Sequence, residues 1–493
     1  MKRISLIFAA ALATIFSTSA QIVDDALRYS QIFYNGTARF NSMGGAFTAL
    51  GGDLSTLSQN PAGLGVFRSS DITFTPQLYH IKNSAEFNGI SEDYLYNFNL
   101  GQAGIVNNII SKTNESGLIT LNAGYSFNKT NNINSSTRIQ GTSHTSSMAD
   151  YWADMSLGIY YRDLAGNAGL AYDAWLMDTI TGSGARAYGT VFSNYGDNPP
   201  SVYGQNIRRI VTEEGYTGEH AISVGGNWSN KLYFGATLGI NRIMYTGHYE
   251  HLETAGQSML SGFENFTYTD HYENTGTGLS LKLGTIIKPV ETVRLGFAFH
   301  SPTFYKINEY FYDNISTNFE NNEHYDFENE PLRYSYALTT PFRALAGVAV
   351  QVKKIALLSA DYEFVDYSAA RFSETGDNYD YSEKNMDIKN TLKSAGNLRF
   401  GAEFRMDKLY LRGGYGYYGK AFKTGELNED LDHSSISFGA GFREKNLSID
   451  FSYTNFSSDR NYILYNTNYE SALAGIETRK NIFALTVGYK FGY

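Results

Sequence analysis

The fold is decided by a stretch near the start of the chain, residues 36–68, which reads GTARFNSMGGAFTALGGDLSTLSQNPAGLGVFR. Its apolar residues recur at steps of three and four, which is the spacing of one helical face. They are Phe40, Met43, Phe47, Leu50, Leu54 and Leu57. Two glycine pairs, Gly44-Gly45 and Gly51-Gly52, interrupt this face, so we expect short helical pieces joined by sharp bends. We interpret the stretch as a compact plug ahead of a long β region.

Two residues set the expected limits of one helical piece. Asp53 is a suitable N-cap for a turn of helix that begins at Leu54, because its carboxylate can accept backbone N–H groups of the first turn. Asn60 precedes Pro61, and the proline ring disfavours helical backbone at the residue before it. We therefore predict that this helix ends by Asn60.

The composition narrows the class of protein. The chain has 493 residues, of which 15% are aromatic, with 39 Tyr and 32 Phe, as expected where aromatic girdles meet two membrane interfaces. It has no cysteine, which excludes disulfides, thiolate metal sites, cysteine nucleophiles and a lipoprotein anchor. The formal net charge of −10 argues against nucleic acid as a partner.

The first 20 residues have the features of a secretory signal peptide. Lys2-Arg3 is followed by an apolar run from Ile4 to Phe16 and by small residues ending at Ala20, so the mature chain is predicted to begin at Gln21. Beyond that point no run of about 18 apolar residues occurs, and we expect no transmembrane helix. The predicted organisation is a signal peptide (1–20), a hatch inside the barrel (21–70) and a transmembrane barrel with long extracellular loops (71–493).

From residue 69 onward, short segments alternate between apolar and polar residues, as in Leu447-Ser448-Ile449-Asp450-Phe451. Fourteen such segments can be counted, many of nine residues or more, which is longer than a soluble sandwich requires. They are 71–81, 93–106, 116–128, 218–229, 231–247, 275–288, 291–300, 340–353, 354–366, 395–405, 408–418, 432–443, 446–457 and 480–493.

The connections between these segments alternate in length. Tight turns alternate with long polar stretches at 129–217, 301–339, 367–394 and 458–479, and this alternation with an even strand number is typical of an outer-membrane barrel. We therefore predict an all-β membrane protein, a 14-stranded antiparallel transmembrane β-barrel with an N-terminal helical hatch. Both termini are expected on the short-turn, periplasmic side.

The run GGAFTALGGD…NPAGL resembles the N-terminal signature of the FadL/OmpP1/TodX family of outer-membrane transporters of hydrophobic compounds. The resemblance implies a hatch that closes a 14-stranded barrel in the outer membrane of a Gram-negative bacterium. It also implies uptake of hydrophobic molecules, with long-chain fatty acids as the expected class. The residues it marks for the hatch and its gating are Gly44, Gly45, Gly51, Gly52, Asn60, Pro61, Ala62 and Gly63.

Strand number bears on function. Barrels of about 8 strands are filled by side chains, whereas those of about 16–18 enclose an aqueous channel, so fourteen strands need a filler such as residues 21–70. The predicted lumen face mixes both signs of charge, and we interpret it as ion-pair ladders that brace the barrel against its hatch. Its members are Lys282, Arg294, Arg343, Asp361, Glu363, Arg399, Glu403, Arg405, Arg412, Arg443 and Asp450.

The longest predicted loop, 129–217, contains an apolar run at Gly169–Met177 that we interpret as a helix lying over or into the barrel mouth. Resemblance to the family implies that such a loop offers hydrophobic ligands a first landing site. The candidates are Leu170, Tyr172, Trp175 and Leu176. The alternative is that these residues only pack the loop against the barrel rim.

An opening in the wall is also expected. Pro76 lies inside the first strand, and because a closed barrel has no edge, we predict a bulge or kink there. The family resemblance suggests a gap in the third strand, where Gly117 and Gly124 are the permissive positions. The sequence leaves open which of the two regions holds the gap.

No enzymatic chemistry is evident. The nine histidines are scattered, and His248 and His251, the only close pair, lack a carboxylate frame for a metal. We expect no enzyme activity, no cofactor and no metal site. Acidic loop runs from Glu309 to Glu330 and from Asp377 to Glu383 have the composition to hold Ca²⁺ or bridge lipopolysaccharide, although such runs commonly only solvate a loop.

The predicted function is passive, ligand-gated uptake by a monomeric barrel whose partners are a hydrophobic small molecule or fatty acid, outer-membrane lipid and lipopolysaccharide. Ligand binding would displace the glycine-hinged hatch, and the ligand would leave through the wall gap. Two alternatives are a haemin-binding surface protein and an adhesive barrel, both of which would act through the extracellular loops.

Overall fold

We describe a computed structural model of the chain, which defines residues 19–113, 116–180, 182–193, 203–256, 262–353, 355–376 and 378–492. Side chains are described from Val23 onward. Residues 1–18 of the predicted signal peptide lie outside the described residues.

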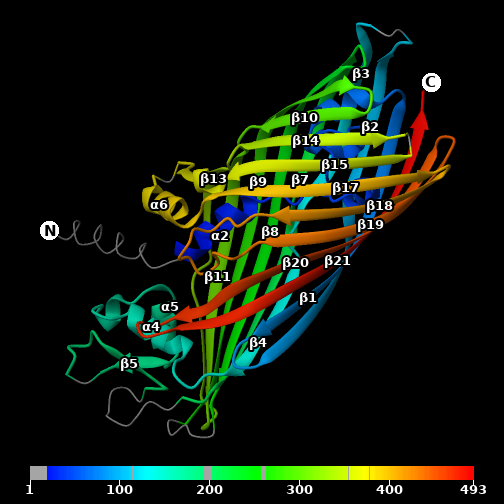
Figure 1. The fold of residues 1–493 in the computed structure, drawn as a ribbon. Coiled ribbons are helices and arrows are strands. Elements are labelled where there is room, and N and C mark those ends of the chain that lie inside the picture. Colours follow the sequence, from blue (N-terminus) through cyan, green and yellow to red (C-terminus); the bar gives the residue numbers. More distant parts are fainter. Residues whose placement is uncertain are drawn as a thin grey trace.

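Fourteen antiparallel strands close into a barrel in the described chain (Figure 1). The ring closes where β1 pairs with β21, from Ser70 opposite Phe491 to Glu86 opposite Gly475. Four of the fourteen are interrupted and continue as a second piece, namely β3, which continues as β4 (Ser135–Thr142), and the three whose second pieces are given in the ring order. In ring order they are β1 (Ser70–Glu86), β2 (Ile90–Ser111), β3 (Leu118–Asn132), β7 (Asn206–Trp228), β8 (Leu232–Thr254), β9 (Phe263–Val290), β10 (Val293–His300) with β11 (Phe304–Phe319), β14 (Arg343–Val352) with β13 (Leu332–Thr339), β15 (Ala356–Asp366) with β16 (Arg371–Glu374), β17 (Ser394–Met406), β18 (Leu409–Tyr418), β19 (His433–Glu444), β20 (Leu447–Asn466) and β21 (Ser471–Phe491).

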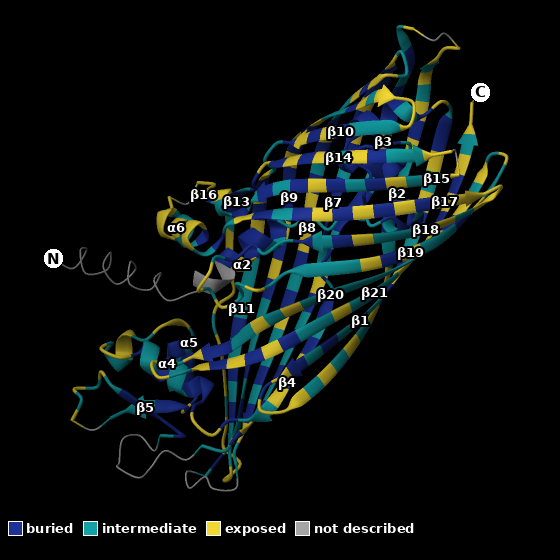
Figure 2. Cartoon of the chain, in the orientation of Figure 1, coloured by how far each residue is buried: buried dark blue, intermediate teal, exposed yellow. Residues whose placement is uncertain are grey.

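The predicted alternation of apolar and polar residues corresponds to the outer and inner faces of the barrel wall. On β20, Leu447, Ile449 and Phe451 are exposed on the outside, whereas Asp450 and Ser452 are buried inside. The same stripes of buried and exposed residues run along the neighbouring strands (Figure 2). Exposed leucines, phenylalanines and valines on the outer face form an apolar belt of the kind that contacts a lipid bilayer. None of the described helices is both long and apolar enough to span a membrane.

The sequence underestimated how far the strands extend on the long-loop side. The stretch 301–339, predicted as a loop, consists largely of β11, β12 (His324–Glu328) and β13, and β20 and β21 extend into the predicted loop 458–479. The third strand likewise continues as β4 (Ser135–Thr142). Beyond the apolar belt a strand does not need an apolar outer face, so its alternation weakens and no longer marks it as a strand.

The hatch lies inside the barrel and consists of α2 (Ser19–Ser30), α3 (Ala38–Ser42) and two 3₁₀ turns, η1 (Leu54–Ser58) and η2 (Pro61–Val66). The Asp53 side chain accepts the Ser55 N–H and caps η1, which confirms the predicted cap. The turn ends before Asn60, whose extended backbone and side chain begin η2 instead. All six apolar residues of the predicted helical face are buried.

Two groups of loop elements cover the long-loop end of the barrel. The larger, which we call the lid, contains α4 (Met148–Met155), η3 (Tyr161–Asp163), α5 (Gly166–Asp173), β5 (Met177–Thr179) and β6 (Tyr188–Thr190). The helix predicted at Gly169–Met177 thus begins earlier and ends at Asp173. The smaller group contains η5 (Tyr367–Ala369) and α6 (Ser382–Thr391).

The two ends of the described chain lie at opposite ends of the barrel (Figure 1), which corrects the expectation that both termini share the short-turn side. Leu27 and its neighbours on α2 join an apolar cluster with Ile388 of α6 and Phe372 of β16, at the long-loop end. Phe491 of β21 pairs with Ser70 at the short-turn end. The difference arises because the buried apolar face of α2 packs in this cluster, which places α2 near the long-loop end of the lumen.

Candidate functional site

The hatch bends at its two glycine pairs, as predicted. Gly44, Gly45, Gly51 and Gly52 have φ values of 62°, 70°, 66° and 67°, in the left-handed region that favours glycine. A Cβ on Gly44 would lie 2.8 Å from the carbonyl oxygen of Tyr415 in the wall. The first pair therefore lets the hatch backbone approach the barrel backbone directly.

The second half of the hatch is held together by the NPAG run. The Asn60 side-chain amide donates to the Thr48 carbonyl at 2.6 Å, while its oxygen accepts the Ala62 N–H. Pro61 is the first residue of η2, and Gly63 is packed so closely that a Cβ there would lie 3.0 Å from the Gly51 Cα. These residues brace the hatch internally.

Side chains of the wall bind backbone carbonyls of the hatch. Lys282 Nζ donates to the Ser58 carbonyl at 2.7 Å, and His300 Nε2 lies 2.7 Å from the Gln59 carbonyl oxygen. Arg294 donates to the Leu50 carbonyl at 2.6 Å. These bonds depend on hatch backbone rather than hatch side chains, so the sequence pattern of the hatch does not show them.

Ion pairs join the hatch to the wall and the wall strands to one another. Arg39 of α3 pairs with Glu403 of β17, which also binds Arg412, and Arg412 reaches Asp450. A second cluster joins Glu363 to Arg343 and Arg399. These contacts form ion-pair ladders of the kind that we predicted from the mixed charges of the lumen face. Arg405 is an exception, because it lies exposed near the short turn after β17.

A small interior cavity remains between the end of α2 and the wall. It is lined by Tyr29, Gln31, Lys282, His300 and Arg343 among others, and its volume is about 20 Å³. That is room for a single water. Ligand pockets are typically about 300–1,000 Å³, so this cavity does not admit a hydrophobic ligand unless the hatch moves.

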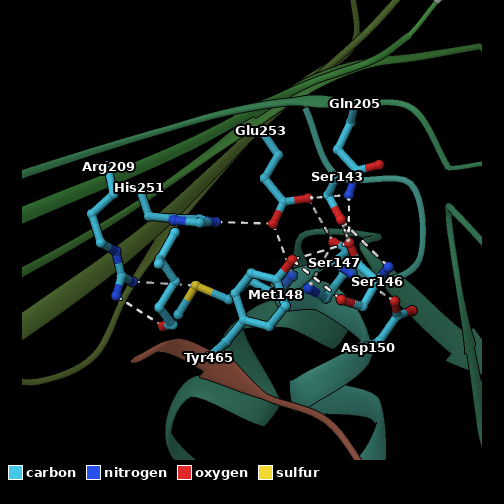
Figure 3. A network of polar contacts seen from close by, with 12 residues as sticks. Ser143, Ser146, Ser147, Met148, Asp150, Gln205, Arg209, His251, Glu253 and Tyr465 are labelled. Carbon is cyan, nitrogen blue, oxygen red and sulfur yellow. Dashed lines mark hydrogen bonds and ion pairs between the residues drawn. The ribbon is translucent and has the colours of Figure 1, made fainter. Parts of the chain in front are cut away.

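A buried polar network anchors the lid to β8 (Figure 3). Glu253 accepts the Ser147 hydroxyl at 2.7 Å and the Met148 N–H at 2.8 Å, at the start of α4. It also contacts His251 Nε2 at 2.9 Å and the Gln205 amide at 3.1 Å. A carboxylate beside a helix N-terminus is electrostatically favourable. Glu253 therefore fixes where α4 sits on the barrel.

Asp150 closes the same network from within the lid. It accepts the Ser147 N–H, the Thr190 hydroxyl at 2.7 Å and the Tyr203 hydroxyl at 2.9 Å. Burial raises the pKa of the Asp150 carboxyl to about 6. These bonds connect α4, β6 and the chain that leads into β7.

The four landing candidates do not share one surface. Leu170 and Leu176 are buried in the apolar core of the lid, together with Trp152 and Phe192. Tyr172 is half-buried. Trp175 is 51% exposed and has a left-handed backbone with φ 60°. Trp175 is thus the candidate that presents most of its surface to the outside.

The ladder between β2 and β3 is incomplete. The two strands pair from Gln102 opposite Asn128 to Ser111 opposite Thr120, whereas residues 90–101 of β2 have no ladder partner on that side in the described chain. β3 shifts register against β7 at Thr130, and the Thr130 carbonyl accepts the N–H of Phe33 from the hatch at 2.9 Å. The hatch thus bonds to β3 where β2 has separated from it.

Of the three wall-gap candidates, Pro76 lies beside this edge, whereas Gly124 and Gly117 lie away from it. A register shift in the β1–β2 ladder falls between Thr75 and Pro76, at the site of the predicted bulge. Gly124 lies in the continuous part of the β2–β3 ladder and faces Leu57 of the hatch, so the wall is closed there. Gly117 precedes β3 and has φ 79° in a turn. The continuous ladder ends at Asn128, so the unpaired edge begins at Lys129, five residues beyond Gly124.

An outer aromatic row beside the unpaired edge was not singled out from the sequence. Tyr94, Tyr96 and Phe98 alternate along β2 and are exposed on the outside. These residues lie within the predicted strand 93–106. Their periodicity predicts a strand, but it does not show that part of this strand lacks a ladder partner. The row extends the apolar belt to the incomplete ladder.

The histidines lie in different parts of the barrel and the lid. Across the described residues no cluster of three or more potential His, Asp or Glu ligands occurs. The ring of His248 lies beside that of His271 on the neighbouring strand, with centroids 6.2 Å apart, and His251 lies in the lid network instead.

The fold and the hatch define a class, the plugged 14-stranded membrane barrel. No family model matches the chain, and no curated protein matches its sequence. Solved structures do match it over nearly the whole length. A FadL homologue of Pseudomonas aeruginosa is 14% identical with a TM-score of 0.56, and the toluene transporter TodX of P. putida is 12% identical with a TM-score of 0.53. Each comparison covers 94% of this chain and 100% of the other. The chain therefore has the fold of FadL-type barrels.

Proposed function

We propose that the chain is a passive channel in the outer membrane of a Gram-negative bacterium that takes up hydrophobic molecules, with long-chain fatty acids as the preferred class. The structures that share its fold include a toluene transporter and the monoaromatic hydrocarbon channel CymD. Monoaromatic hydrocarbons are therefore the second class of ligand to test.

One observation supports the proposal most strongly, the hydrogen bond from Phe33 of the hatch to Thr130 at the unpaired edge of β3. Movement of the hatch would break this bond and uncover the edge between β2 and β3. A ligand leaving there would enter the bilayer sideways rather than cross the aqueous periplasmic opening, which avoids exposing its apolar surface at about 0.8 kcal/mol per CH₂.

The remaining steps follow from the same arrangement. A ligand collects at the lid near Trp175, enters the lumen and takes the place of hatch contacts. Binding moves the hatch only if the ligand binds the displaced state more tightly than the resting one. The exposed row at Tyr94, Tyr96 and Phe98 would then receive the ligand on the outside of β2.

A reversible crosslink across the unpaired edge tests this function. Asn97 and Asn132 approach each other across the edge, with the Asn132 side-chain amide 3.5 Å from the Asn97 side-chain oxygen. The natural chain has no cysteine, so the pair Asn97→Cys and Asn132→Cys would introduce the only thiols. The matched control pair is Ala103→Cys and Phe127→Cys, which are already partners in the continuous ladder.

Uptake of a radiolabelled fatty acid, and separately of toluene, is measured in cells that lack another channel for it. We expect oxidation to abolish uptake through the edge pair, reduction to restore it, and the control pair to transport under both conditions. Uptake that persists through a fully oxidised edge pair would refute the lateral exit. Ligand binding without uptake in the unmodified chain would favour the haemin-binding or adhesive alternative.

A further inference from the structure

The outer face of the barrel has a hollow where β14, β15, β17 and β18 run side by side. Its volume is about 460 Å³, within the range of small-molecule pockets. Val348, Leu358, Phe400 and Tyr415 stand around it, and each is exposed on the outer surface. The hollow is therefore a depression within the apolar belt, on the side of the wall away from the lumen.

The hollow exists because small residues occupy outward positions on adjacent strands. Ala360, Ala402 and Gly413 line it, and Ala402 is the ladder partner of both Leu358 and Gly413. A Cβ on Gly413 would have no neighbour closer than 3.9 Å. The barrel itself thus leaves this volume unfilled.

The hatch lies directly behind the same part of the wall. Gly401 and Gly414 face inward there, and a Cβ on Gly414 would lie 2.1 Å from the Gly44 nitrogen. A Cβ on Gly401 would lie 2.6 Å from the Met43 carbonyl oxygen. At Gly413-Gly414 only the backbone of the wall separates the hatch bend from the membrane.

The surroundings of the hollow indicate the chemistry of an occupant. It is continuous with the membrane-facing belt, and no charged side chain lines it. An empty hollow would cost its lining the dispersion contacts that a packed neighbour supplies. Because lipid tails are as apolar as the lining, packing rather than the hydrophobic effect would hold the occupant.

We propose that the hollow is a binding site for one acyl chain of a membrane lipid, seated against the wall behind the hatch bend at Gly44. The proposal depends on the membrane-facing barrel and not on uptake of any ligand. It gives the hatch a lipid neighbour at a place far from the unpaired edge of β2.

Filling the hollow tests the proposal. The variant Ala402→Phe with Gly413→Leu projects larger side chains into it, while Ala344→Leu adds bulk to an outward alanine of β14 that does not line it. The full-length barrels are purified in detergent with dipalmitoyl phosphatidylethanolamine, and the lipids retained are counted by native mass spectrometry. Heat-dependent gel migration confirms that each variant is folded.

We expect the unmodified barrel and Ala344→Leu to retain one more phospholipid than the filled variant. Equal retention by all three folded barrels would overturn the proposal, and so would a hollow that retains detergent but no phospholipid. Should the filled variant fail to fold, Gly413→Leu alone provides the same comparison. Because the readout is lipid binding, its outcome is separate from that of the uptake experiment.

Discussion

Arg39 of the hatch helix α3 and Glu403 of wall strand β17 form a largely buried ion pair, with Arg39 Nε 3.0 Å from Glu403 Oε2. Glu403 also accepts a hydrogen bond from Arg412 Nε at 2.6 Å, and Arg412 Nη1 lies 2.7 Å from Asp450 Oδ1. The hatch is thus joined to an ion-pair network that spans three wall strands. One carboxylate supports both the hatch contact and a contact within the wall.

Replacing Glu403 by Gln should loosen the hatch without opening the barrel. The change leaves two buried guanidinium groups without their shared carboxylate, and breaking a buried pair in this way costs about 3–5 kcal/mol. We expect trypsin to cleave at Arg39 in the folded variant but not in the unmodified barrel. Glu444→Gln breaks the exposed pair with Lys408 and should cost at most about 1 kcal/mol. Equal protection of Arg39 in both variants would contradict this role.

The glycine pairs of the hatch should respond unequally to alanine. Left-handed backbone costs an alanine about 1–2 kcal/mol at each position. A Cβ on Gly51 would also lie 2.8 Å from the Gly63 Cα, whereas one on Gly52 would meet only the Val66 side chain, at 3.2 Å. Gly51→Ala should therefore expose the hatch to proteolysis more than Gly52→Ala.

Gated uptake should also be impaired when a whole glycine pair is replaced, because alanine disfavours the left-handed bends that shape the hatch. We expect Ala-Ala at Gly44-Gly45 or at Gly51-Gly52 to reduce the rate of ligand uptake while the barrel keeps its heat-dependent gel migration. Unchanged uptake in both double variants would count against a gating role for these bends.

Two neighbouring glycines on β18 provide a sharper comparison. Gly414→Ala would place a Cβ 2.1 Å from the Gly44 nitrogen of the hatch, whereas Gly413→Ala has no atom closer than 3.9 Å. Overpacking a tight contact costs typically about 1–3 kcal/mol. We expect faster hydrogen exchange at Met43–Gly45 in Gly414→Ala and no change in Gly413→Ala, measured by mass spectrometry on the folded barrels.

The hatch and the plan of the wall could be predicted because both depend on local patterns. The spacing of Phe40, Met43 and Phe47 and the cap at Asp53 determine short-range structure, and the period-two alternation marks the membrane-facing part of each strand. The alternation stops being informative above the apolar belt, where β11 and β13 carry polar residues on the outside. There the strands are held by ladder bonds that sequence does not reveal.

The unpaired edge could not be located from sequence for a related reason. Gly124 and Pro76 are permissive positions, but whether a strand has a partner depends on where its neighbour runs. The sequence around Phe33 does not indicate that its N–H will donate to the carbonyl of Thr130, which lies 97 residues further along the chain. Likewise, Trp175 and Leu176 are adjacent in sequence, and only the packing of the lid makes Leu176 a core residue and leaves Trp175 exposed.

Docking of α2 should depend on pH through Asp25. Burial raises the pKa of the Asp25 carboxyl from 3.8 to about 7, in opposition to the lowering effect of Arg28. Because the folded state holds the proton more tightly, Asp25 favours docking most below pH 3.8, and this contribution is lost as pH rises to about 7. We expect exchange of α2 amides, corrected for intrinsic pH dependence, to report weaker protection across that window. Asp25→Asn should flatten this response, and an unchanged response would assign it to another group.

Adjacent residues of the lid allow ligand capture to be separated from packing. Leu176 is fully buried in the lid core, and truncating a buried leucine to alanine costs about 2–5 kcal/mol, so Leu176→Ala should expose the lid to proteolysis. Trp175 is 51% exposed, so Trp175→Ala should leave the lid protected. If Trp175 receives the ligand, its variant should bind a fluorescent fatty acid more weakly while keeping the lid intact. Unchanged binding by Trp175→Ala, with a protected lid, would show that the lid tryptophan takes no part in capture.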